Sequence, residues 1–238
     1  MKGFSIVIPT YKENLNFLKL IKSIFYQLRY EKKFEVIIVD DNSADGIDES
    51  YKKIKNRYKN LKLFIRKKRI RDLTQSCIQG FKLSKFDNVL VMDSDLQHDP
   101  KYIKKMIAKF DKNNCDILVA CRNFKDRSKV DLGFLRFFLS RFIILLYNFL
   151  LGFKTTDPMS GFFLFKKKIF VYNQKKLFGK GYKILVDLIY SSSQNLNIQD
   201  LLINFRKRKF NKSKMNLNIL FLILYFLIVR FLEKSFKK

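Results

Sequence analysis

The sequence predicts an α/β fold, an open and mostly parallel sheet with helices on its faces. Short apolar strands alternate with stretches of helical periodicity along the 238 residues, as in chains of βα units. Three of these strands end in polar residues, which is typical of the ligand-binding edge of such sheets. Hydrophobic residues make up 47% of the chain, so it can bury a large core. We expect one globular domain over residues 1–214 and an apolar and basic C-terminal helix over 215–238.

The first half of the chain supplies alternating strands and helices. The apolar run FSIVIPT predicts a strand over 4–10, and apolar residues recur at helical spacing over 14–28, with Asn14 as the candidate N-cap. A second apolar run, 34–41, ends in two aspartates before the turn sequence NSADG. The remaining elements expected in this half are a helix of sequence ESYKKIKNRYK, a strand over 61–66 and a helix over 71–84.

Two further strands are expected in the middle of the chain, over 88–95 and 115–122. After them, residues 132–153 are apolar around most of a helical circumference but include Arg136 and Arg141. This pattern is typical of a buried core helix or of a helix that lies in a membrane interface, with its arginines reaching the headgroups.

The charge of the chain is strongly positive, since 49 Lys and Arg against 21 Asp and Glu give +28. Such an excess indicates an anionic partner, which can be nucleic acid, a phosphate-bearing substrate or an anionic membrane surface, although part of it is ordinary solvated lysine. The cysteines Cys77, Cys115 and Cys121 lack metal-like spacing and predict reduced thiols in a cytosolic setting. The N-terminus leads directly into a strand, so we expect no secretory signal.

Aspartates gather at two of the predicted strand ends. Asp93 and Asp95 follow an apolar strand with one residue between them, so both side chains can point to the same side of the sheet edge. There they can share one Mg²⁺ or Mn²⁺ whose remaining positions go to a diphosphate, and Gln97 can add a carbonyl oxygen. The alternative is that both are loop acids or caps of a helix near Pro100. A second aspartate pair ends a neighbouring strand, and several acids together in a chain of charge +28 favour the cation.

The chain resembles the inverting nucleotide-sugar glycosyltransferases of family 2 in four segments, which are, in order, IVIPTYKE, VIIVDDNSADG, VLVMDSDLQHDP and TDPMSGFFLFKKKIF. The likeness is strongest to dolichyl-phosphate mannose synthases and bacterial polyprenyl-phosphate hexosyltransferases, and it extends from about residue 4 to 215. It implies a GT-A-like fold that binds a nucleotide sugar, GDP-mannose or UDP-glucose, with Mg²⁺ or Mn²⁺. It also implies a polyprenyl or dolichyl phosphate as the acceptor.

The resemblance implies a donor site at the predicted strand ends. Lys12 stands where the family usually has Asn. The 66–76 segment departs from the Gly-rich stretch usual in the family, with Arg71 where a small residue is expected, so the base of the donor is left open between GDP and UDP. Asp93, Asp95 and Gln97 match the metal and diphosphate site. The residues that match nucleotide-binding positions are Pro9, Tyr11, Glu13, Asp40, Asp41 and Asp93.

The resemblance also implies residues for catalysis and for the acceptor. The segment RKFNKSK resembles R-x-x-G-x-S-K and supplies Arg208, Ser213 and Lys214, with Asn211 in place of the glycine. The catalytic positions are matched by Asp95, Arg122, Arg136, Ser140 and Arg208, and the acceptor-phosphate positions by Arg122, Arg136, Ser140 and Lys214.

The chemistry of such a transfer agrees with these residue types. A metal offsets charge on the departing diphosphate without proton transfer. A lipid monophosphate is already anionic and needs no strong base, whereas arginines bind its oxygens in pairs and stay charged. We therefore expect Asp157 to orient its loop rather than act as a base, and His98 to be a loop residue rather than a metal ligand.

The C-terminal segment predicts contact with a membrane. Its apolar run of 11 residues, Ile219 to Val229, is shorter than the ~20 residues that a spanning helix needs. We expect it to lie in the interface, with spanning as the alternative. The basic residues that follow suit anionic cytosolic lipid, so the catalytic domain is expected on the cytoplasmic side.

Three functions compete for this sequence. The favoured one is a metal-dependent transferase that makes a polyprenyl-phosphate hexose, most simply from GDP-mannose. The second is a family 2 transferase that adds sugar, from a UDP-sugar for instance, to a saccharide or cell-surface glycan, but no carboxylate pair suited to a base follows residue 155. The third is a basic module for nucleic acid or membrane, which leaves the acids at strand ends unexplained. We therefore expect no nucleic-acid partner.

Overall fold

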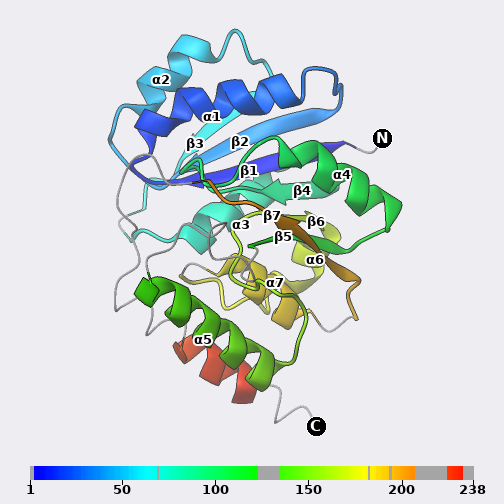
Figure 1. Ribbon diagram of the computed structural model, residues 1–238. Coiled ribbons are helices and arrows are strands. Elements are labelled where there is room, and N and C mark those ends of the chain that lie inside the picture. Colours follow the sequence, from blue (N-terminus) through cyan, green and yellow to red (C-terminus); the bar gives the residue numbers. More distant parts are fainter. Residues whose placement is uncertain are drawn as a thin grey trace.

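The computed structural model describes residues 3–68, 70–122, 134–181, 183–192, 195–206 and 224–232, and for 134–139 the backbone alone. These residues form one seven-stranded sheet in the order β3-β2-β1-β4-β6-β5-β7 (Figure 1). Every pairing is parallel except those of β6, which runs antiparallel to both β4 and β5. The strands are β1 (Phe4–Thr10), β2 (Phe34–Asp40), β3 (Leu61–Ile65), β4 (Asn88–Val91), β5 (Ile117–Arg122), β6 (Phe163–Lys166) and β7 (Ile198–Ile203).

Helices cover both faces of this sheet (Figure 1). They are α1 (Asn14–Gln27), α2 (Ile47–Ile54), α3 (Leu73–Leu83), α4 (Tyr102–Lys112), α5 (Phe134–Leu151), α6 (Lys168–Asn173) and α7 (Ile184–Ser191). The predicted open, mostly parallel α/β sheet with flanking helices is therefore confirmed.

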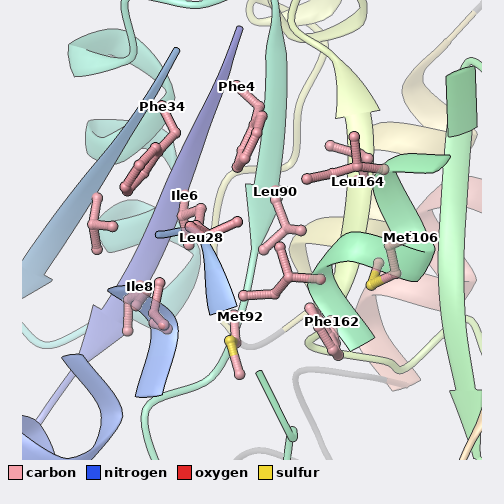
Figure 2. Close-up of a cluster of buried hydrophobic side chains, with 14 of the residues drawn as sticks. Phe4, Ile6, Ile8, Leu28, Phe34, Leu90, Met92, Met106, Phe162 and Leu164 are labelled. Atoms are coloured by element: carbon pink, nitrogen blue, oxygen red, sulfur yellow. The ribbon is translucent and has the colours of Figure 1, made fainter. Parts of the chain in front are cut away.

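Side-chain alternation along the strands explains the two layers. Phe4, Ile6 and Ile8 point to the face covered by α1 and α4, where Leu90 and Met106 join them in the largest core cluster (Figure 2). The intervening residues pack against α3, α6 and α7 on the other face.

Helix α3 lies unusually close to β1. A Cβ atom built on Gly80 would lie 2.3 Å from Cγ1 of Val7, so only glycine permits this approach. The N-terminus of α3 is held by Asp72, whose side chain accepts a hydrogen bond from the backbone N–H of Gln75. The close packing fixes the start of α3 beside the carboxyl end of β1.

Residues 224–232 form a helix that lies beside α5 (Figure 1). Tyr147 of α5, Val186 of α7 and Phe226 belong to a third buried cluster. Within this cluster's surroundings, Arg230 forms a buried ion pair with Asp187 of α7, with 2.7 Å between Nη2 and Oδ1. Of the predicted C-terminal helix, 215–223 and 233–238 lie outside the described residues, as does the proposed boundary at 214. No helix in the described ranges has the length and hydrophobicity needed to cross a bilayer.

Two local predictions are wrong. Asn14 is the first residue of α1 rather than its N-cap, because its backbone N–H and side-chain amide bond to Asp45. The predicted strand over 88–95 ends at Val91. The backbone N–H of Met92 still bonds to the carbonyl of Val7, but the N–H of Asp93 turns to the side chain of His98. The cysteines are confirmed as free thiols, and all three are buried.

Candidate functional site

A cavity of about 420 Å³ opens at the carboxyl ends of β1, β2 and β4. One wall comes from the loop after β1 and the start of α3, and another from the loop after β4, the 158–161 segment and the start of α7. This is the edge at which open parallel sheets bind ligands. The predicted site residues that line it are Pro9, Tyr11, Glu13, Asp41, Asp93 and Asp95.

The D-x-D loop is shaped by hydrogen bonds from its own residues. The backbone N–H of Asp93 donates to Nδ1 of His98 at 3.2 Å, and Oδ1 of Asp95 accepts from the backbone N–H of Gln97 at 3.0 Å. Leu96 between them has a φ of 63°, a left-handed backbone that reverses the chain. These contacts turn both carboxylates into the cavity, and they explain why the strand stops before the aspartates.

His98 supports the loop from behind. Its side chain is buried between Phe162 and Phe205, with ring centroids 5.2 and 4.9 Å away. Since Nδ1 accepts the N–H of Asp93, the imidazole is assigned the neutral tautomer with its proton on Nε2. This arrangement agrees with the expected role of a loop residue.

Gly161 lies against the carboxylate of Asp93, where a larger residue would clash. A Cβ atom on Gly161 would lie 2.2 Å from Oδ2 of Asp93, so the carboxylate rests directly against the glycine backbone. The exposed fraction of the Asp93 side chain is 36%, whereas Asp95 is 7% exposed. The two carboxylates therefore differ in solvation although both face the cavity.

The two aspartates after β2 have different surroundings. Asp40 accepts hydrogen bonds from the backbone and hydroxyl of Ser43 and is not among the described residues that line the cavity. Asp41 lines the cavity and is held by the guanidinium of Arg66 and by the backbone N–H of Asp72, at 2.6 Å. Burial raises the pKa of both carboxyls and outweighs these favourable bonds. Of this predicted pair, only Asp41 faces the space where a donor would bind, and nucleotide contact by either stays a prediction.

Arg71 and Tyr11 form part of one cavity wall. Its guanidinium lies 4.4 Å from the ring centroid of Tyr11, and both residues line the cavity. Glu13, also in the lining, accepts a hydrogen bond from Asn16 at 2.7 Å. The residue that departs from the family pattern is therefore part of the cavity.

Arg122 and Asp157 form a buried fork beyond the cavity lining. Nε and Nη2 of Arg122 donate to the two oxygens of Asp157 at 2.7 and 2.8 Å, and its backbone N–H donates to the same carboxylate. Burial opposes the charged form of Arg122, but Asp157 outweighs it and raises the pKa of the guanidinium. The expectation that Asp157 orients its surroundings agrees with this geometry.

The remaining predicted site residues do not line the cavity within the described part of the chain, or they lie outside the described residues. Gln97 and Ser140 are not among the described lining residues; Ser140 is buried on α5, and the backbone oxygen of Gln97 accepts from Arg206. The side chain of Arg136, and the whole of Arg208, Asn211, Ser213 and Lys214, lie outside the described residues.

Lys183 is the cavity residue that sequence reasoning missed. It stands at the N-cap position of α7 and lines the cavity near the D-x-D loop. Nothing local in its sequence marks it, because a lone lysine before an apolar helix is common in a chain with 49 Lys and Arg.

Known proteins similar to this chain agree with the predicted family. Residues 5–172 match the model described as Glycosyl transferase family 2. A dolichol-phosphate mannosyltransferase of Pyrococcus furiosus is 33% identical over 78% of this chain and 51% of its own length. A dolichol-phosphate mannosyltransferase of Mycosarcoma maydis is 26% identical over 86% of this chain and 71% of its own length. The chain thus spans about half the length of the Pyrococcus relative.

The fold is similar to that of glucosyl-3-phosphoglycerate synthase from Mycobacterium tuberculosis, solved in complex with Mn²⁺, UDP-glucose and phosphoglyceric acid. The TM-score is 0.72 at 16% identity, over 98% of this chain and 79% of that one. At this identity the likeness shows the GT-A-like fold alone. Because the family model covers well over half of the 238 residues, the chain belongs to glycosyl transferase family 2.

Proposed function

We propose that the protein transfers a hexose from a nucleotide sugar to a polyprenyl or dolichyl phosphate, with mannose from GDP-mannose as the favoured sugar. The observation that carries this proposal is the cavity, in which both D-x-D aspartates share one space with Tyr11 and Asp41 at the carboxyl ends of the strands. Two relatives named dolichol-phosphate mannosyltransferase support the same reaction.

Asp93 and Asp95 fit a Mg²⁺ or Mn²⁺ ion. Two carboxylates leave most coordination positions to phosphate oxygens and water, which is how Mg²⁺ usually binds in nucleotide sites. Among the residues described, no group of three or more His, Cys, Asp and Glu offers an all-protein metal site instead. When bound, such an ion offsets the negative charge of the departing diphosphate. The Mn²⁺ in the complex of the solved neighbour supports this assignment.

The acceptor phosphate is assigned to Arg122, Arg136, Ser140 and Lys214, with Arg208 as a further contact. Arg122 is held in one orientation by Asp157, which suits a guanidinium that binds phosphate oxygens. Asp157 is fully buried and engaged in this fork, so it is not available to deprotonate an acceptor. An anionic lipid phosphate needs no such base, in contrast to a sugar hydroxyl.

An exposed apolar surface supports attachment to a membrane. Helix α5 and helix 224–232 lie side by side (Figure 1). Both expose large apolar side chains to solvent, with Phe149 86% exposed. In a chain of charge +28, such a surface suits the interface of an anionic leaflet, with the catalytic domain on the cytoplasmic side. The exposed residues are Phe142, Leu145, Phe149, Phe153, Tyr225, Ile228, Phe231 and Leu232.

The test uses the purified full-length chain with vesicles that contain dolichyl phosphate. Labelled GDP-mannose or UDP-glucose is added with Mn²⁺, and label in the organic phase is counted. We expect transfer from one donor, lost with chelator and with Asp95→Asn but kept with Asp111→Asn, a matched change on the exposed surface of α4. Transfer only to an added saccharide would overturn the lipid acceptor, and no use of either donor would overturn the proposed reaction.

A further inference from the structure

Lys183 is a half-buried cation that forms no direct ion pair or hydrogen bond through its ammonium within the described part of the chain. Asp157 and Asp93 favour its charged form from beyond ion-pair distance, but burial and Arg122 together outweigh them. Of these two acids, Asp157 already accepts three hydrogen bonds from Arg122. The positive charge of Arg122 adds to that of Lys183 rather than offsetting it.

The backbone increases the positive potential at this position. Lys183 is the N-cap of α7, and its carbonyl accepts the first hydrogen bond of the helix from the N–H of Asp187. The start of a helix carries partial positive charge, so Ser, Thr, Asp and Asn are favoured there and a lysine is unfavourable. The side chain of Lys183 makes no capping hydrogen bond.

The surroundings of Lys183 therefore match an anion. Burial, the largest effect, and the neighbouring Arg122 lower the pKa of the ammonium to about 8, whereas Asp157 and Asp93 act in the opposite direction. An ammonium with three donors suits the tetrahedral oxygens of a phosphate, and the D-x-D carboxylates on the same cavity would reach that phosphate through a divalent ion.

We propose that Lys183 binds a phosphate group at the D-x-D end of the cavity. The site takes either the diphosphate of the nucleotide-sugar donor or the monophosphate of the lipid acceptor. The assignment of these two sources rests on the proposed function, whereas phosphate binding by itself does not.

The first experiment measures affinity in the full-length protein by calorimetry, in Mn²⁺ buffer, for pyrophosphate, GDP, UDP and farnesyl phosphate in micelles. We compare Lys183→Met and Lys183→Arg with Lys175→Met, which removes the same charge from an exposed position after α6. Lys183→Met should weaken binding by about 10- to 100-fold, as for loss of a charge-assisted hydrogen bond, while Lys183→Arg keeps most of the affinity and Lys175→Met all of it.

The pattern of losses identifies the ligand. A loss confined to pyrophosphate, GDP and UDP assigns Lys183 to the donor, and a loss confined to farnesyl phosphate assigns it to the acceptor. Equal affinities in wild type and Lys183→Met for all four ligands would overturn the proposal, as would failure of the wild type to bind any. If pyrophosphate binding depends on Lys183 but the transfer assay shows no sugar transfer, the result would support this inference and contradict the proposed function.

A second experiment needs no variant. The wild-type protein is labelled at lysines with acetic anhydride, with and without Mn²⁺ and pyrophosphate or farnesyl phosphate, and each lysine is quantified by mass spectrometry. We expect the ligand to protect Lys183 and to leave Lys175 unchanged. Equal labelling of Lys183 with and without both ligands would contradict a direct contact.

Discussion

Replacing Lys183 by methionine should make the ligand-free protein more stable. The pKa of this lysine falls from an ordinary value of 10.5 to about 8 in the folded protein, because burial and Arg122 oppose its charge. At about 1.4 kcal/mol for each pH unit, the folded state loses about 3 kcal/mol at neutral pH by keeping this ammonium charged. Methionine fills a similar volume without charge, so we expect a gain of about 1–3 kcal/mol in the free energy of unfolding.

The gain should depend on pH with a defined sign. Below pH 8 the lysine is charged in both the folded and the unfolded chain, so the full difference from Lys183→Met is present. Between pH 8 and 10.5 the unfolded chain binds more protons at this residue than the folded protein. The stability of the wild type therefore rises relative to the variant, and the difference closes.

Urea unfolding in metal-free buffer from pH 7 to 10 measures this difference, with circular dichroism as the signal because the chain has no Trp. Lys175→Met is the control and should leave stability unchanged at every pH. A Lys183→Met protein that is less stable than wild type at pH 7 would refute the reasoning, since the ammonium would then hold the fold together. A gain in stability together with weaker phosphate binding would show that Lys183 serves ligand binding at the expense of stability.

Three further changes test the architecture around the cavity. Asp157→Asn removes the buried charge that both side-chain nitrogens of the Arg122 fork bind, and it should cost about 2–5 kcal/mol in chemical unfolding. A loss below about 0.5 kcal/mol would mean that the fork is not structural. Gly161→Ala forces the carboxylate of Asp93 to move, so the Mn²⁺ concentration for half-maximal activity should rise about tenfold. The free energy of unfolding should fall by less than about 1 kcal/mol, and an unchanged Mn²⁺ titration would contradict the expectation. Arg230→Met removes an ion-pair partner of the buried Asp187 on α7, so amide hydrogen exchange in helix 224–232 and α7 should become at least about tenfold faster. Exchange in β1 should stay unchanged and serves as the internal control. Unchanged exchange in all three elements would contradict the prediction.

The central strands were predictable because their residues are buried on both faces. Every residue of β1 and β2 is buried, so each strand reads as a nearly continuous apolar run that ends in polar residues. β6 was not recognised as a strand. Its four residues, FLFK, are too few for periodicity to separate a strand from a loop, and its antiparallel pairing joins two strands distant in sequence.

The site was predictable where a motif carries its own geometry. The D-x-D pair is such a case, since both aspartates follow one strand and reach the cavity from one loop. Asp40 and Asp41 show the limit, because Asp40 is the last residue of β2 and Asp41 follows it, and only Asp41 lines the cavity. Lys183 lies 90 residues after Asp93, and only the tertiary fold brings it to the same wall.

The outer helices and the cavity proposed to hold the donor are connected by hydrogen bonds and an ion pair. Arg230 on helix 224–232 pairs with Asp187, which also accepts the N–H of Gly179 at 2.8 Å. Two residues later, the N–H of Gly181 donates to Asp72 at 2.7 Å, and the N–H of Asp72 donates to Asp41 in the cavity wall.

This path joins the apolar surface to the nucleotide side of the cavity through buried or half-buried groups. A buried carboxylate that loses its ion-pair partner is costly. We therefore expect that separation of helix 224–232 from α7 would also disturb the 179–181 segment, which bonds to Asp72. A protein that meets a lipid substrate at its outer helices needs the reacting groups at a fixed height above the membrane. The Arg230–Asp187 pair contributes to this relation, because it joins the surface proposed to contact lipid to α7, whose first residues line the cavity proposed to hold the donor.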